Sequence, residues 1–196
     1  MSRNHLNICV FLDADGVLWE DIGPGGIITG KDQAISILDK FNMNVDPDWI
    51  KIVISNQTYA ARKKMKYFKF RNLVSSLFEA LVFSDLIDDY AICYHHPKAA
   101  NVFLRKNCKC RKPSPGLITR MIKTHNINID KSSFIGDRIT DIQAGANAGI
   151  KHLFLITNPR MLEMNDNSGS ASGIYSFLPL NSIDEFFLVK GMKHEN

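Results

Sequence analysis

Short apolar runs alternate along this chain with longer segments of mixed polarity. Runs of this length that are rich in Ile, Val and Phe indicate strands buried on both faces, as in a parallel sheet. The expected strands cover Ile8–Leu12, Ile52–Gln57, Tyr90–Cys93, Ser133–Asp137 and His152–Ile156. The helices expected between them cover Lys31–Phe41, Tyr59–Leu81, Pro115–His125 and Thr140–Ala148. This alternation predicts an α/β fold with a doubly wound parallel sheet.

The remaining segments are rich in turn-forming residues. A Gly-rich loop leads to Gly30, and Asn165–Gly173 has the Asn, Ser and Gly content of a flexible loop. Ile183–Val189 is expected to form a terminal helix or a turn beside the sheet. No insertion between the expected strands is large enough for a separate cap domain. Since the chain has 196 residues and 45% hydrophobic content, we expect one domain, residues 1–196, with a substantial core.

Two acids end the first expected strand. Asp13 and Asp15 follow the run Ile8–Leu12 directly, at the carboxyl edge where open α/β sheets bind ligands. Two carboxylates this close are both ionised only if a cation lies between them, and otherwise one of them holds a proton. A divalent metal, or a nucleophile beside a proton carrier, explains the pair. The alternative is a solvated strand-to-turn junction, because Asp is a common turn residue.

Three later segments place further polar residues at strand ends or helix starts. Ser55 and Asn56 end the second strand, and Arg111 and Lys112 precede a helix that begins at a Pro-Gly pair, where the positive helix end adds to their charge. Asp137 ends the strand that begins at Ser133, and Asp141 follows it. Each residue has an ordinary structural role, such as a helix N-cap or a solvated charge. Their occurrence together favours a phosphate or metal site.

The four segments in this order resemble the haloacid dehalogenase-like phosphotransferase superfamily. Its Asp-x-Asp, strand-end Ser or Thr, Lys, and Gly-Asp-x-x-x-Asp motifs stand here as DADGV, ISNQ, RKPSPG and GDRITD. The resemblance spans about residues 8–155, and the combination of motifs is specific although each one is weak. It implies a Rossmann-like fold and phosphoryl transfer through a covalent aspartyl-phosphate with Mg2+.

The resemblance implies catalytic roles that suit the residues concerned. Asp13 is the expected nucleophile, because a covalent intermediate divides hydrolysis into two displacements with lower barriers. Asp15 is expected to protonate the leaving alkoxide and then to deprotonate the attacking water. Ser55 and Lys112 are expected to bind the phosphoryl oxygens as charge develops.

The resemblance also implies a magnesium site. Asp13, Asp137 and the main-chain carbonyl of Asp15 are the expected ligands, since Mg2+ prefers oxygen donors and keeps the nucleophile and the phosphate from repelling each other. Asp141 is expected to orient this site rather than to bind the metal.

Three of the four cysteines lie in the middle of the chain. Cys93, His95, Cys108 and Cys110 form a Cys-x-His and a Cys-x-Cys pair separated by twelve residues, and three Cys with one His match a closed structural Zn2+ site. His96 is the alternative histidine ligand, although the symmetry of the spacing favours His95. The other interpretation is a set of ordinary buried or redox thiols.

The zinc pattern narrows the resemblance. CYHHP followed by CKCRKPSPG looks like the zinc-loop subgroup, which includes bacterial phosphatases of D-glycero-D-manno-heptose 1,7-bisphosphate and of histidinol phosphate. In that subgroup a metal clamp over about residues 93–110 stiffens the loop that carries Arg111 into the site. The resemblance implies that Arg111 recognises substrate and that Asn56, Gln57, Thr58 and Arg138 lie around it.

Two positions in the first motif depart from the pattern of the heptose phosphatases, and so do the Gly-rich segment after it and the basic residues at 62–66. The DRDGVIN pattern of these phosphatases carries Arg and Asn where Ala14 and Trp19 stand here. The resemblance implies removal of the 7-phosphate of heptose 1,7-bisphosphate, and these departures add action on a related sugar phosphate to the expectation. The alternatives are histidinol phosphate, a nucleic-acid 3′-phosphate, and a binding module stabilised by zinc that has no turnover.

Charge and hydropathy limit the partners. The formal charge of +4 is mild, and much of the excess lies in the aromatic and basic stretch Arg62–Arg71. Such a stretch is more often a solvated helix face than a nucleic-acid surface, so nucleic acid is not an expected partner. No apolar run reaches membrane-spanning length. Unpaired Cys9 and the absence of a signal-peptide pattern favour a reducing, cytoplasmic compartment, where we expect a monomeric enzyme of carbohydrate metabolism.

Overall fold

The computed structural model describes residues 6–19, 31–62, 66–156, 178–180 and 185–186. Within these residues, six parallel strands form one sheet in the order β3-β2-β1-β4-β5-β6. The strands are β1 (Cys9–Leu12), β2 (Ile50–Asn56), β3 (Asp89–Cys93), β4 (Ser133–Gly136), β5 (His152–Ile156) and β6 (Leu178–Leu180). The predicted doubly wound parallel sheet is confirmed. The strand order reverses between β1 and β4, and the crevice at this switch point is where such sheets bind ligands.

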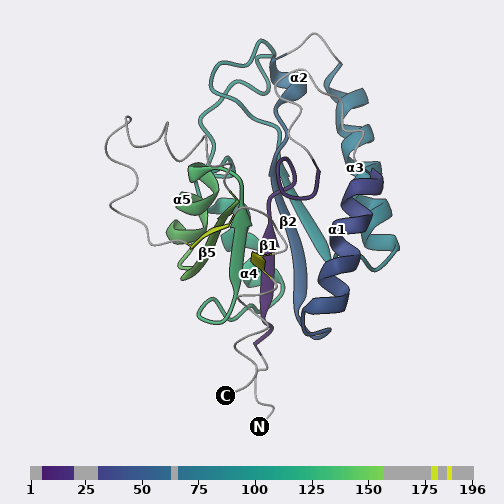
Figure 1. Ribbon diagram of the computed structural model, residues 1–196. Coiled ribbons are helices and arrows are strands. Elements are labelled where there is room, and N and C mark those ends of the chain that lie inside the picture. Colours follow the sequence, from purple (N-terminus) through teal and green to yellow (C-terminus); the bar gives the residue numbers. More distant parts are fainter. Residues whose placement is uncertain (1–5, 20–30, 63–65, 157–177, 181–184, 187–196) are drawn as a thin grey trace.

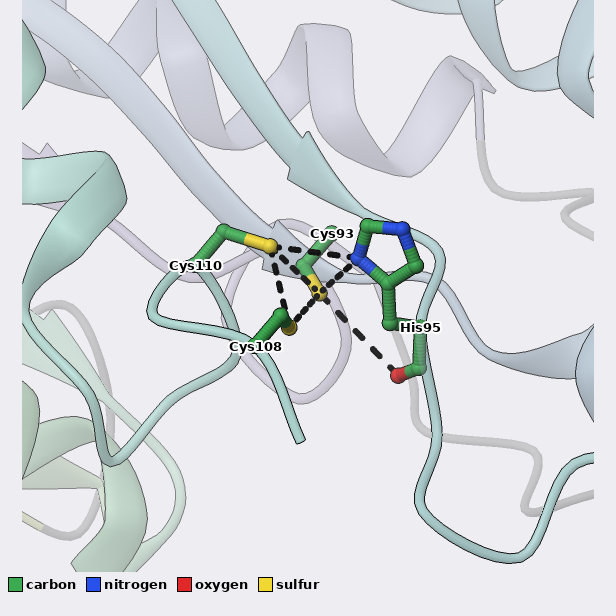
Figure 2. Close-up of side chains that lie close together, drawn as sticks. All are labelled: Cys93, His95, Cys108 and Cys110. Atoms are coloured by element: carbon green, nitrogen blue, oxygen red, sulfur yellow. Dashed lines mark hydrogen bonds between the residues drawn. The ribbon is translucent and has the colours of Figure 1, made fainter. Parts of the chain in front are cut away.

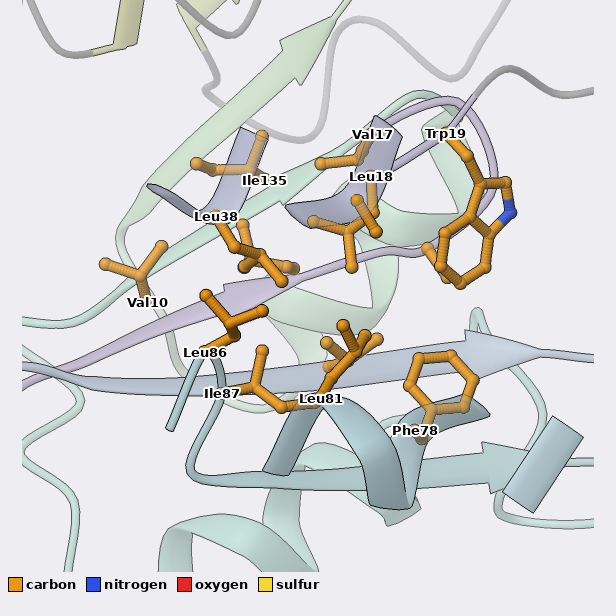
Figure 3. Close-up of a cluster of buried hydrophobic side chains, with 14 of the residues drawn as sticks. Val10, Val17, Leu18, Trp19, Leu38, Phe78, Leu81, Leu86, Ile87 and Ile135 are labelled. Carbon is orange, nitrogen blue, oxygen red and sulfur yellow. The ribbon is translucent and has the colours of Figure 1, made fainter. Parts of the chain in front are cut away.

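Helices cover both faces of the sheet (Figure 1). They are α1 (Lys31–Asn44), α2 (Tyr59–Arg62), α3 (Tyr67–Phe83), α4 (Gly116–Thr124) and α5 (Ile139–Asn147). Successive β1 residues alternate between the two sides: Val10 joins a core beneath α1 and α3 (Figure 3), and Phe11 joins a core beneath α4 and α5. Because both faces of β1 are buried, its continuous apolar sequence is explained.

The helical region predicted from Tyr59 to Leu81 is two helices in the structure. Lys66, directly before α3, has an extended backbone (φ −60°, ψ 123°), so α3 does not extend toward α2. Polarity patterning alone did not reveal this break because the basic residues around it are compatible with an exposed helix face.

Strand β6 was not predicted. Its three residues, Leu178–Leu180, include a proline, which lacks a backbone donor and occurs in sheets mainly at edges. In the part of the chain that the structure describes, β6 pairs in parallel with β5 and ends the sheet.

Several predicted segments lie outside the described residues. These are the Gly-rich loop before Gly30 and the loop Asn165–Gly173. Of Ile183–Val189, only residues 185 and 186 are described, and both are helical. Phe186 is fully buried and packs edge-on against Phe154, with ring centroids 5.0 Å apart. None of the described helices is long and apolar enough to cross a membrane.

Candidate active site

Asp13 and Lys112 form a buried ion pair at the carboxyl end of β1. The backbone N–H of Asp13 donates to the carbonyl of Ile135 (2.9 Å), which fixes the start of the loop after β1 against β4. Lys112 Nζ lies 2.7 Å from Asp13 Oδ1, and both side chains are less than a tenth exposed. Residues almost one hundred positions apart therefore meet, as expected from their position in the predicted motifs.

Lys112 has further partners. Its Nζ lies 2.8 Å from Asp141 Oδ1, donates to the Ile54 carbonyl (2.8 Å), and lies 5.7 Å from the centroid of the Phe134 ring. Burial disfavours the charged ammonium, but the two carboxylates outweigh that effect and raise the pKa of Lys112. A permanent positive charge is thus fixed beside the nucleophile that the sequence predicted.

Asp141 lies at the start of α5 with both carboxylate oxygens engaged. Its Oδ2 accepts a hydrogen bond from the Arg138 backbone N–H (3.0 Å), while Oδ1 contacts Lys112. The chain at Gly136 leaves room for this carboxylate, because a Cβ there would overlap the Asp141 side chain. This arrangement is compatible with the positioning role expected for Asp141.

Three carboxylates converge at this edge of the sheet. One oxygen each from Asp13, Asp137 and Asp141 lies within 4.8 Å of the others. With Lys112, the ionised cluster carries two net negative charges, which one divalent cation would balance. Burial raises the pKa of Asp13 well above its usual value; the Lys112 charge opposes this effect, and the Asp141 and Asp137 carboxylates add to it. The donor set therefore fits Mg2+.

Gly16 makes the close approach of Asp137 possible. Its φ is +81°, a conformation that side chains of L residues rarely adopt, and a Cβ at this position would overlap the Asp137 carboxyl group. The chain thereby turns sharply after Asp15 and lets β4 bring Asp137 against the loop after β1.

Asp15 accepts hydrogen bonds on both carboxylate oxygens. Trp19 Nε1 donates to Oδ1 (2.6 Å), and Gln57 Nε2 donates to Oδ2 (3.1 Å). Gln57 Nε2 also lies 3.0 Å from Ser55 Oγ, so one amide links the predicted acid–base residue to the predicted phosphate ligand. The contact of Trp19 with Asp15 was missed in the sequence, where Trp19 was only a departure from a related pattern. The i, i+4 spacing after a Gly turn was the available signal.

Asn56 contacts the backbone of Lys112 in the structure. Its Oδ1 accepts from the Lys112 N–H and its Nδ2 donates to the Lys112 carbonyl, both at 3.2 Å. Both ends of the Asn56 amide are thus occupied by protein, which gives this residue a positioning role besides the substrate contact that the resemblance implied.

The other residues expected around the substrate, Arg111, Arg138 and Thr58, differ in their exposure and in their contacts. Arg111 Nη1 donates to the His95 carbonyl (3.4 Å), which connects it with the cysteine-rich loop. The Arg138 side chain is 59% exposed, and its Nε lies 3.6 Å from Asp137 Oδ2. The Thr58 carbonyl accepts from the Ala61 N–H (3.0 Å) at the start of α2.

The predicted zinc ligands come together in one cluster (Figure 2). Cys93, Cys108 and Cys110 Sγ lie 3.0 to 3.6 Å from one another, and His95 Nδ1 lies 3.2 Å from Cys110 Sγ and 3.7 Å from Cys93 Sγ. A tetrahedral Zn2+ with Zn–S bonds near 2.3 Å separates its sulfur ligands by about 3.8 Å. The three thiols are free, and the four ligand atoms, which lie slightly closer together than around a bound ion, are grouped as one zinc ion would need them. His96 instead accepts from the Lys98 N–H (3.0 Å) through Nδ1.

Burial changes the proton affinities in this cluster. It raises the pKa of the Cys93 and Cys110 thiols, and it lowers that of His95 with help from the Lys106 charge. A neutral imidazole is the form that ligates metal, whereas a buried thiolate requires a positive charge nearby. A zinc ion would supply that charge.

The comparisons with known proteins agree with this geometry. A family model described as HAD-hydrolase-like matches residues 109–164. The D-glycero-alpha-D-manno-heptose-1,7-bisphosphate 7-phosphatase of Photorhabdus laumondii is 30% identical over 185 residues, which span 92% of this chain and 99% of the relative. The D-glycero-beta-D-manno-heptose-1,7-bisphosphate 7-phosphatase of Helicobacter pylori is 33% identical over 159 residues, which span 78% of this chain and 86% of the relative.

A solved structure supports the fold. The D,D-heptose 1,7-bisphosphate phosphatase from B. bronchiseptica, crystallised with magnesium and phosphate, has a TM-score of 0.66 at 22% identity and covers 93% of this chain and 99% of its own. The fold and the acidic strand-end site define a hydrolase of the HAD-like class. The chain belongs to this family and, within it, to the phosphatases that these relatives represent.

Proposed function

We propose that this protein is a Mg2+-dependent phosphomonoesterase that removes the 7-phosphate of D-glycero-D-manno-heptose 1,7-bisphosphate or of a closely related sugar phosphate. The observation that carries the proposal is the buried Lys112–Asp13 contact of 2.7 Å at the switch point of the sheet. It sets a fixed cation beside a carboxylate, as an anionic nucleophile needs when it approaches an anionic ester. We further propose that the whole chain acts as one phosphatase domain.

In the first step Asp13 attacks phosphorus. A carboxylate oxygen of Asp13 forms a bond to phosphorus while the phosphorus–ester oxygen bond breaks, and Asp15 gives its proton to the departing alkoxide. Lys112 and the Ser55 hydroxyl bind the phosphoryl oxygens. The product of this step is an acyl phosphate on Asp13.

In the second step Asp15, now ionised, takes a proton from water. The water oxygen attacks phosphorus and the bond to Asp13 breaks, which releases inorganic phosphate and restores the Asp13 carboxylate. Asp15 then holds the proton again and is ready for the next ester. The same residue serves both steps, so its carboxyl group must face the bond that breaks and the water that attacks.

Two metals accompany this chemistry in the proposal. Asp13, Asp137 and the Asp15 carbonyl would hold Mg2+, which supplies positive charge between nucleophile and phosphate. The cluster of Cys93, His95, Cys108 and Cys110 offers four ligands and would hold Zn2+ as a structural ion. It would stiffen the loop that continues directly into Arg111 and Lys112.

The proposed sugar specificity rests on the named relatives and on two cations, the partly buried Arg111 and the exposed Arg138. Arg111 and Arg138 are proposed to bind the part of the substrate beyond the transferred phosphate, because guanidinium groups pair with phosphate and hydroxyl oxygens. Asn56, Gln57 and Thr58 would border the same space. Ala14 is fully buried and supplies no polar group at the position where the resemblance places an arginine.

Phosphate release from a panel of esters with Mg2+ tests the proposal. The panel contains heptose 1,7-bisphosphate, histidinol phosphate, other sugar phosphates and an oligonucleotide with a 3′-phosphate. The blank is Asp13→Asn, and the matched control is Asp130→Asn, an exposed aspartate paired with Lys151. We expect activity in wild type and control but not in the blank.

The preference among esters decides the substrate. A kcat/KM at least tenfold higher for the heptose, worth about 1.4 kcal/mol of transition-state binding, supports the proposed substrate. A higher value for histidinol phosphate or the oligonucleotide reassigns the enzyme to that ester. Turnover by Asp13→Asn at the wild-type rate overturns the mechanism.

A further inference from the structure

We propose that Trp19 is a positioning residue for catalysis, and that with Gln57 it fixes the orientation of the Asp15 carboxyl group. The two donors hold different oxygens: the indole N–H of Trp19 binds Oδ1 (2.6 Å) and the amide of Gln57 binds Oδ2 (3.1 Å). The inference rests on the proposed function, in which Asp15 is the acid and then the base.

The Trp19 donor is held firmly by its surroundings. Trp19 is only 4% exposed, and its ring packs against Phe78 of α3 with centroids 5.7 Å apart (Figure 3). Its carbonyl accepts from the Gly16 N–H (2.7 Å), and its own N–H lies 3.4 Å from the Ala14 carbonyl. The hydrophobic core thus fixes the indole, and the indole in turn fixes Asp15.

Gln57 approaches from a different strand. It follows β2, is 5% exposed, and its Nε2 reaches both Asp15 and Ser55. A carboxyl group held through a single oxygen can turn about its Cβ–Cγ bond. Donors on both oxygens, one from the loop after β1 and one from the end of β2, prevent that rotation.

The two bonds bear on proton transfer because they fix the plane of the Asp15 carboxyl group. Each carboxylate oxygen has two lone-pair directions in that plane, so the donors from Trp19 and Gln57 set the direction in which Asp15 can present its proton. An acid held in one orientation is already aligned with the leaving oxygen before the reaction begins. Small errors in such placement lower the rate strongly. Trp19 therefore acts through Asp15 without touching substrate.

The dependence of kcat/KM on the leaving group distinguishes positioning from a merely structural role. Esters of sugar hydroxyls leave as basic alkoxides and need a proton, whereas p-nitrophenolate leaves without one. Since kcat/KM reports the steps up to leaving-group departure, Trp19→Phe is expected to lower it at least about tenfold for the sugar phosphate. For p-nitrophenyl phosphate we expect a change below about threefold.

The control is Trp49→Phe, which removes the only other indole of the chain. Gln57→Met removes the second donor and serves if Trp19→Phe does not fold; it is expected to lower the sugar-to-aryl ratio of kcat/KM in the same direction. An equal fall on both esters, or no fall, in the variant that folds overturns the inference. If wild type releases no more phosphate than Asp13→Asn from either ester, the proposed function fails, and the inference falls with it.

Discussion

The side-chain amide of Asn56 is bonded to both the N–H and the carbonyl of Lys112, each at 3.2 Å. Asn56 ends β2 next to Ser55. Lys112 lies two residues after Cys110, at the end of the loop that carries the cysteines. The pair therefore attaches that loop to the sheet at the position where Lys112 Nζ turns inward toward Asp13. Placement of the buried ammonium depends on a main-chain contact as well as on its own salt bridges.

Replacing Asn56 should therefore affect both stability and catalysis. Asn56→Leu keeps the branched shape of the side chain but leaves two polar main-chain groups of Lys112 without their partners. We expect a loss of roughly 1–3 kcal/mol in the free energy of unfolding and a fall in kcat/KM of about tenfold or more. Denaturant unfolding and phosphate release measure the two effects.

The matched control is Asn147→Leu. Asn147 also donates to a main-chain carbonyl of this segment, that of Pro113 at 3.2 Å, but the contact is exposed. We expect nearly wild-type stability and activity in this variant. Equal effects of the two substitutions would show that the Asn56–Lys112 contact contributes no more to stability and activity than the exposed Asn147–Pro113 contact does.

Loss of a zinc ligand should damage the fold more than the chemistry. Cys108→Ser leaves three of the four ligands, and we expect it to lower the free energy of unfolding by about 3 kcal/mol or more. Metal analysis should find about one zinc per wild-type chain and much less in the variant. Cys9→Ala is the control, because Cys9 lies within β1 and is not among the four clustered ligands. An unchanged melting temperature and zinc content in Cys108→Ser would refute the site.

The pH dependence of stability should reveal the cost of the buried Asp13 carboxylate. Burial raises the pKa of Asp13 in the folded protein, partly opposed by Lys112 and reinforced by Asp141 and Asp137. The folded state then binds a proton more tightly than the unfolded chain does. The free energy of unfolding therefore falls as the pH rises from the pKa of Asp13 in the unfolded chain to its higher pKa in the folded protein. Without Mg2+, Asp13→Asn should melt at a higher temperature than wild type at neutral pH.

The difference should vanish in acid. Below about pH 4, the ordinary value of an aspartate, Asp13 is protonated in both states and its replacement by Asn changes no charge. Added Mg2+ should stabilise wild type more than the variant at neutral pH. The melts use magnesium-free buffer without chelator, so that bound zinc is retained. A lower melting temperature for Asp13→Asn across the whole range would contradict the prediction.

Gly16→Ala should interfere with the metal site through the backbone. An L side chain at positive φ costs roughly 1–2 kcal/mol, and the added Cβ would displace the Asp137 carboxyl. We expect a fall in kcat of about tenfold or more with a raised Mg2+ requirement. Activity measured against Mg2+ concentration tests this expectation.

Gly149→Ala separates backbone strain from the effect on the site. Gly149 also has a positive φ, of +92°, but the atom that an added Cβ would meet there is Ile129 Cδ1 (3.2 Å) and not a carboxyl group of the site. This variant should lose similar stability and keep its Mg2+ dependence. If it loses activity to the same extent, the Gly16 effect is general destabilisation.

Much of the fold follows from local pattern. The strand His152–Ile156 was predicted with the bounds it has in the structure. A short run of apolar residues bounded by polar ones is typical of a buried strand. The break between α2 and α3 was missed since its flanking residues suit an exposed helix, and β6 was missed since three residues around a proline carry too little pattern.

The sequence by itself determined which residues could form the site, because motif spacing puts Asp13, Ser55 and Asp137 at the ends of parallel strands, and these ends share one edge of a sheet. It likewise grouped three cysteines with a histidine. Only the tertiary structure decided how side chains satisfy one another there. The contacts of Trp19 with Asp15 and of Asn56 with Lys112 depend on rotamers and on packing between distant segments, and buried polar groups take whichever partner the packed core brings within reach.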